Sequence, residues 1–190
     1  MKIIATLSLL AIIMLSGMNA SAQDTGGDSY TIQRLIIYNT DGNVLLEKHE
    51  NGWMTPALRH SSRTTINEGL ENLASEFGLT ISPPKLAGNF MFISEYKPTS
   101  SFRQHYTAKL VDGDLKRPEG KLDAGWFSPH DAIELMSLPD AKLVGAVGEM
   151  TEQVLNYPEI IWGGTFTLWK ENDVTVYKAS EHFYPIGTVN

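Results

Sequence analysis

Apolar side chains recur along the chain with two different periods, and each period predicts its own kind of element. Alternating or clustered apolar residues bounded by turn residues are typical of strands. Asp41-Gly42 is a strong signal for a hairpin turn between the first two such segments. The segments predicted as strands are Tyr30–Tyr38, Val44–Lys48, Leu86–Tyr96, Phe102–Val111 and a terminal hairpin of Thr165–Lys170 with Val174–Lys178.

The helical period is clearest between Ile66 and Phe77, where apolar residues are spaced by four, three and four positions. Such spacing places them on one stripe of a helix. Thr65 and Glu68 have the spacing of a capping box, and Gly78 stands where a left-handed glycine ends a helix. These signals predict a helix with a defined beginning and end.

Two further helices are predicted late in the chain. Ser128 followed by Pro129 is typical of a helix start, and this helix is predicted to reach Met136. A longer helix is predicted from Pro139 to about Asn156. Strands around one early helix, followed by two late helices, indicate an α+β architecture.

The N-terminus has the pattern of a secretion signal. Lys2 precedes an apolar run from Ile3 to Leu15, and Ala20-Ser21-Ala22 forms a small-residue cleavage site. A membrane anchor is the alternative, but the apolar run is shorter than the ~20 residues that span a bilayer. We therefore predict cleavage before Gln23, no stable membrane insertion afterwards, and export to the periplasm or the medium.

Composition excludes several classes of function. The formal net charge of −7 argues against a nucleic-acid binder, which neutralises phosphates with Lys and Arg. The absence of cysteine excludes disulfides, thiolate zinc sites and cysteine nucleophiles.

The order of these elements and several short motifs resemble the Nudix superfamily over roughly residues 35–135. That family's box is G-x5-E-x7-R-E-U-x-E-E-x-G-U, in which U is aliphatic. The residues that match are Gly52-Trp53-Met54-Thr55-Pro56 before the helix, Leu73, Glu76, Gly78 and Leu79 at the end of the box, and Trp126-Phe127-Ser128 before the short helix.

The resemblance implies a Nudix-like α/β/α sandwich with a mixed sheet, extended by a C-terminal helix and β-hairpin. It divides the chain into a signal at 1–22, a flexible lead-in at 23–29, a Nudix-like domain at 30–138, and the helix and hairpin at 139–190, packed on that domain.

The box departs from the family pattern at most of its charged positions, and Glu76 alone of the acidic set remains. The family's carboxylates hold divalent cations, which prefer oxygen ligands. The residues that replace the pattern are Ala57 and Leu58 for the glycines, Arg63 for the first Glu, Glu71 for the Arg, and Asn72 and Ser75 for the next two Glu.

The resemblance still suggests candidate metal ligands. Glu76 is expected to bind Mg²⁺ or Mn²⁺ weakly, with Glu119 and Asp123 before Trp126 as further ligands. Glu76 and Asp123 are the candidate catalytic residues. The alternatives are a solvated carboxylate for Glu76 and an ordinary polar loop for the other two.

Three arginines are candidate substrate-binding residues. Arg103 is on a strand that faces the substrate cleft in Nudix folds, and strand alternation puts His105 on the same face. Arg59 and Arg63 make the box loop basic. Arginine suits phosphate because its planar guanidinium donates two parallel hydrogen bonds. Solvated surface arginines are the alternative.

Two functions follow from the resemblance. The first is a divergent exported hydrolase of a diphosphate-linked substrate, of the nucleoside diphosphate-X type, with weakened or lost activity. The second is a catalytically inactive Nudix-fold module of the cell envelope that binds a small phosphate-containing ligand or an envelope protein. Isomerase chemistry on isoprenoids, known on the same fold, is disfavoured because it would call for a cysteine.

Overall fold

The structure is a computed structural model that describes residues 30–60, 64–97, 99–137 and 142–189. The predicted secretion signal therefore lies outside the described residues. The elements are β1 (Tyr30–Tyr38), β2 (Val44–His49), β3 (Gly52–Met54), β4 (Ala57–Arg59), α1 (Ile66–Glu76), β5 (Leu79–Ile81), β6 (Lys85–Ser94), β7 (Ser101–Gly113), β8 (Asp123–Phe127), α2 (Pro129–Met136), α3 (Lys142–Asn156), β9 (Ile160–Glu171) and β10 (Val174–Thr188).

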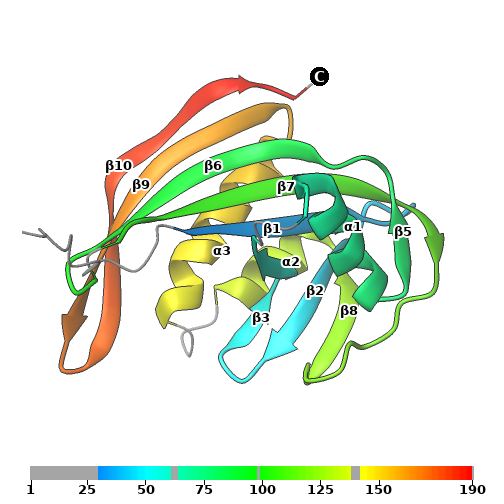
Figure 1. The fold of residues 1–190 in the computed structure, drawn as a ribbon, viewed down its shortest axis with the longest axis horizontal. Helices are drawn as coiled ribbons and strands as arrows, with labels where there is room; N and C mark the ends of the chain where they lie inside the picture. The colour runs from blue at the N-terminus through cyan, green and yellow to red at the C-terminus, as the bar shows by residue number, and fades with distance from the viewer. Residues whose placement is uncertain (1–29, 61–63, 98, 138–141, 190) are drawn as a thin grey trace, which may run out of the picture.

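The strands form one mixed sheet with the order β10-β9-β6-β7-β1-β2-β3, and Figure 1 shows its long strands lying side by side across the molecule. The pairs β1–β7 and β6–β9 are parallel, and the others are antiparallel. Three short strands pair beside this path: β4 with β1, β5 with β7, and β8 with β2.

Two apolar cores lie on opposite faces of the sheet. Alternate residues of β1 point to different sides, so that Leu35 and Ile37 pack with α1, whereas Ile36 packs with α2 and α3. Phe77 of the α1 side and Phe166 of the α3 side are both fully buried. The result is the α/β/α sandwich with a mixed sheet that the sequence predicted.

Helix α1 forms as its sequence pattern predicted. The Thr65 hydroxyl accepts a hydrogen bond from the backbone N–H of Glu68, and the Glu68 carboxylate accepts one from the backbone N–H of Thr65. Gly78 has φ +76°, the left-handed conformation that glycine adopts most readily. Both termini of the helix are therefore fixed by its own sequence.

The C-terminal hairpin is much longer than the pattern predicted, because it continues the sheet. Strand β9 pairs with β6 from Gly88↔Trp162 to Ser94↔Leu168, and β10 pairs with β9 across three register shifts. The two glycines at Gly163 and Gly164 and these irregularities interrupt the alternation on which the prediction depended. None of the described helices is long and apolar enough to cross a membrane.

Candidate anion-binding site

Two arginines lie on either side of β1 because two different strands pair with it at the same residue. Ile32 is the register partner of Arg59 on β4 and of Arg103 on β7. Neighbouring strands lie about 4.8 Å apart, so the two arginine backbones are separated by about 10 Å. Strand alternation turns both side chains toward the α3 side, the face of Arg34 and Ile36.

The ring of Tyr30 contacts both guanidinium groups. The guanidinium carbon of Arg59 is 4.3 Å from the centre of this ring, and that of Arg103 is 5.8 Å from it. Arg103 also lies 4.6 Å from the ring centre of Phe92. Cation–π contacts of this kind hold a guanidinium in place while leaving its N–H groups free to bind an anion.

A small pocket opens beside this cluster. It has a volume of about 80 Å³ and is lined by Tyr30, Phe92 and Arg103, together with Ser94 at the end of β6, Ser101 at the start of β7, and Lys97 and Thr99 between these strands. Within the described part of the chain, the Arg103 Nε is buried without a hydrogen-bond partner. The pocket therefore offers this donor and positive charge to a small anion.

A third arginine, Arg34, is buried within electrostatic range of Arg103. Arg34 is buried and donates to the backbone carbonyl of Thr55, and burial together with the nearby charge of Arg103 lowers its pKa to about 10, against the opposing effect of Glu47. Burial likewise lowers the pKa of Arg103. An anion bound here would relieve the repulsion between these guanidinium groups.

His105 of β7, the register partner of Arg34, is a buried neutral group. Burial, followed by the charge of Arg34, holds its pKa well below the ordinary value of 6.5. Its Nε2 lies 3.2 Å from the Thr151 Oγ1, and that hydroxyl already donates to the Val147 carbonyl. The Thr151 oxygen must therefore accept from His105, which fixes the imidazole proton on Nε2.

The box helix presents a different surface. The buried side of α1 is apolar, and Asn72, Ser75 and Glu76 are all exposed on the other side. The Ser75 hydroxyl donates to the backbone carbonyl of Glu71, as is common inside helices. Of these three side chains only Glu76 is a carboxylate, and the carboxylate of Glu68, one turn earlier, already accepts hydrogen bonds from Thr65. These positions are therefore poor in the free ligands that Mg²⁺ prefers.

The other predicted metal ligands do not complete a set with Glu76. Glu119 is exposed beside a turn, and the Asp123 carboxylate accepts a hydrogen bond from the backbone N–H of Ala124. The only cluster of three or more possible metal ligands among the described residues lies elsewhere and includes none of the three. The structure does not bring Glu76, Glu119 and Asp123 together as a metal centre.

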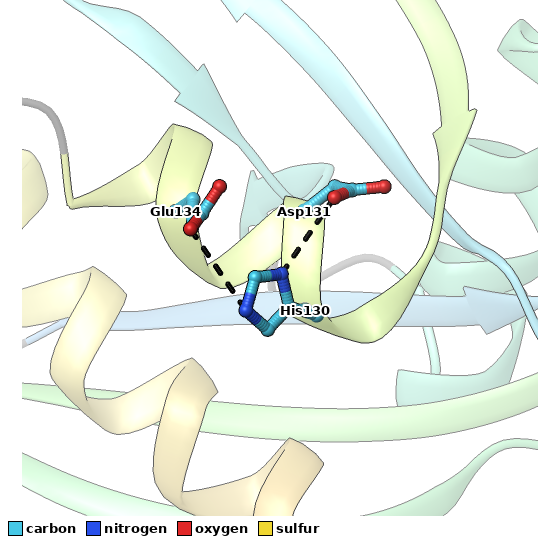
Figure 2. A group of neighbouring side chains, drawn as sticks. All are labelled: His130, Asp131 and Glu134. Atoms are coloured by element: carbon cyan, nitrogen blue, oxygen red, sulfur yellow. Dashed lines mark ion pairs between the residues drawn. The ribbon is translucent and has the colours of Figure 1, made fainter.

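That one cluster is His130, Asp131 and Glu134 on α2, which Figure 2 shows on the surface of the helix. The His130 Nδ1 lies 3.7 Å from the Asp131 Oδ1, and the His130 Nε2 lies 3.8 Å from the Glu134 Oε1. All three side chains are exposed. Asp131 is already bonded to Ser128 at the helix N-terminus. Capping and ion pairs along one helix account for this arrangement.

Two of the three predicted substrate-binding residues, Arg59 and Arg103, contact the ring of Tyr30. The third, Arg63, lies outside the described residues. Sequence reasoning missed Tyr30 and Lys97. Tyr30 stands at the first position of a strand, and a link to the arginines appears only when β4 and β7 are paired with β1. No local motif signals that pairing.

Comparison with solved structures finds the same fold in Nudix enzymes. A mutator MutT protein from Bacillus halodurans superimposes with a TM-score of 0.61 at 22% identity, covering 80% of this chain and 97% of that one. An ADP-ribose pyrophosphatase from Streptococcus suis gives 0.52 at 14%, covering 75% and 100%. A UDP-X diphosphatase gives 0.53 at 16%, covering 70% and 64%.

No family model matches the sequence, and no curated protein matches it. These likenesses show that the chain has the Nudix fold.

Proposed function

We propose that this chain is a divergent, exported Nudix-type hydrolase that binds a diphosphate-linked small molecule and has weakened hydrolytic activity. One observation carries the binding half of the proposal: Arg59 and Arg103 converge on Tyr30 beside a small pocket that Arg103 lines. Two guanidinium groups at one aromatic ring suit a ligand with two phosphates. The substrate class is taken from two proteins of the same fold, the ADP-ribose pyrophosphatase and the UDP-X diphosphatase.

Weakened hydrolysis follows from the surface of α1. The residues near Glu76 do not fit the divalent-metal site that the family resemblance implies, because Asn72 and Ser75 are neutral and Glu119 and Asp123 do not join Glu76 in a cluster. Mg²⁺ or Mn²⁺ would therefore bind weakly. Less bound metal leaves less activation of water and less neutralisation of the developing phosphate charge.

The test is a product assay with ADP-ribose. Protein purified after expression of the full chain is incubated with ADP-ribose, with and without Mn²⁺, and AMP is quantified by chromatography. The proposal predicts slow formation of AMP in the presence of Mn²⁺ that stops in Glu76→Gln, while Glu119→Gln serves as a control for loss of one exposed carboxylate. Turnover that is unchanged in Glu76→Gln contradicts the assignment of that residue.

The second candidate function is a binding module without hydrolysis. It is favoured by the replacement of two box carboxylates with Asn72 and Ser75 on the exposed face of an otherwise intact helix. The same assay separates the candidates: saturable ADP-ribose binding without AMP under any condition supports the module. An envelope protein is then the other kind of partner to test.

Export is proposed from residues 1–22, which carry the charged, apolar and small-residue parts of a secretion signal. When the full chain is expressed in a bacterial host, N-terminal sequencing of the periplasmic or secreted protein should begin at Gln23. A protein that keeps Met1 and stays with the cytoplasm contradicts export.

A further inference from the structure

A second pocket lies at the opposite end of β1 from the arginines. Its volume is about 430 Å³, within the range of roughly 300–1,000 Å³ that small-molecule sites occupy. Tyr38, which ends β1, lines it, whereas Tyr30 begins that strand. Eight residues of strand separate the two tyrosines by about 26 Å. A ligand in this pocket would not overlap the anion-binding site.

Five separate segments build the pocket. Tyr38 of β1 and Lys109 of β7 are register partners, and so are Thr107 of β7 and Lys85 of β6. The loop before β6 adds Pro83, the turn after α3 adds Pro158, and the end of the chain adds Val189. The backbone N–H of Val189 donates to the carbonyl of Glu159, which ties this last wall to the turn.

The lining combines apolar walls with positive charge. Tyr38, Pro83, Pro158 and Val189 supply carbon surface, and the charged lining residues are Lys85 and Lys109, with no carboxylate among them. The chain as a whole carries a formal net charge of −7. Lys109 therefore places a positive charge on a lining that has no acidic residue, and this charge favours an anion.

Hydroxyl groups add fixed donors. The Ser82 Oγ accepts a hydrogen bond from the backbone N–H of Lys109, so its own proton is available to another acceptor. Burial raises the pKa of Tyr38, which keeps that hydroxyl protonated. A carboxylate accepts hydrogen bonds from both kinds of group and pairs with ammonium.

We propose that this pocket binds a small amphipathic carboxylate, with its apolar body between Tyr38, Pro83, Pro158 and Val189 and its charged group toward Lys109. The walls select for carbon surface and the lysine selects for the sign of the charge. Because the site lies far from Arg59 and Arg103, it does not depend on the function proposed above.

Decanoate is the probe, and calorimetric titration of the purified protein is the measurement. Decanoate should bind saturably at one site, and octanoate and hexanoate more weakly, by about fourfold per methylene removed. Decyltrimethylammonium, which has the same chain and the opposite charge, should not bind. Equal binding of the cation overturns the proposal, as does the absence of saturable decanoate binding.

Variants locate the site. Lys109→Glu reverses the charge at the pocket and should weaken decanoate binding by about tenfold or more. Thr107→Trp should fill the pocket and abolish binding. Lys178→Glu makes the same charge change on β10, outside the lining, and should bind like the parent. Decanoate binding that is the same in all four proteins overturns the assignment.

The two proposed binding sites can be tested independently of each other. Lys109→Glu should leave the binding of ADP-ribose unchanged, and Arg103→Met should leave the binding of decanoate unchanged. A parent protein that binds decanoate but not ADP-ribose contradicts the proposed function alone, and loss of decanoate binding in Arg103→Met contradicts a separate second site.

Discussion

Helix α1 and the arginine end of β1 meet at β4, and they differ in what they have kept. Leu58 of β4 packs with the α1 core, and the next residue, Arg59, faces Tyr30 on the other side of the sheet. On α1 the buried stripe and the cap are intact, but of the exposed side chains Asn72, Ser75 and Glu76 only Glu76 is a carboxylate. At the arginine end, cationic side chains converge on Tyr30. The residues that hold a fold together are thus separable from those that give it chemistry.

The largest expected effect is on the buried side of α1. Phe77 is fully buried between the helix and the sheet. Phe77→Ala should lower the free energy of unfolding by about 3–5 kcal/mol, because it removes apolar contacts and leaves a cavity. Glu76→Ala on the exposed side should change it by less than about 0.5 kcal/mol. Urea denaturation measures both, and similar losses would erase the contrast between the two sides.

The next effect separates the two ends by ligand binding. Arg59→Met and Arg103→Met each remove a guanidinium from the Tyr30 ring and should weaken ADP-ribose binding by about 10- to 100-fold, the range for a charged hydrogen-bonding group. Calorimetry measures the affinity, and circular dichroism checks the fold. Arg117→Met, on an exposed loop, is the matched control. If both variants bind ADP-ribose as tightly as the parent, the arginine end of β1 is not the binding site.

A smaller effect depends on pH and concerns the buried His105. His105 is neutral when folded because its pKa is well below 6.5, whereas in the unfolded chain it takes up a proton below about pH 6.5. The unfolded state then binds more protons, so the free energy of unfolding should fall as the pH is lowered below that value, by up to about 1.4 kcal/mol per pH unit. In His105→Gln this contribution should disappear, and denaturation midpoints between pH 7 and 5 measure it. If the free energy of unfolding falls equally with decreasing pH in the parent and in His105→Gln, this prediction is refuted.

The smallest effect is on the cap of α1. Thr65→Ala removes the hydroxyl that accepts from the Glu68 N–H and should cost about 1 kcal/mol. Thr65→Ser keeps a hydroxyl and should recover most of the loss. Thermal unfolding compares the three proteins, and an Ala variant as stable as the parent would show that the cap adds nothing to the retained scaffold.

Local signals predicted the parts of the fold that local chemistry controls. The capping box, Gly78 and the helix starting at Pro129 were all readable from neighbouring residues, and the α/β/α class followed from the resemblance. The full length of β9 and β10 could not be predicted from local signals, since β9 pairs with β6, far away in the chain, and β10 follows β9. The same limit applies to the site. The sequence indicates Arg59 and Arg103 separately as candidates, but their common contact with Tyr30 results from the register of β4, β1 and β7.

The central proposal is that the arginine end of β1 binds the ligand and that the exposed face of α1 binds divalent metal only weakly. Its most direct test is the calorimetric titration of ADP-ribose in EDTA, repeated with Mn²⁺, on the parent, Arg103→Met and Glu76→Gln. The account predicts saturable binding in EDTA that is lost in Arg103→Met and kept in Glu76→Gln. Binding that requires Mn²⁺ and Glu76 but tolerates the loss of Arg103 would contradict it.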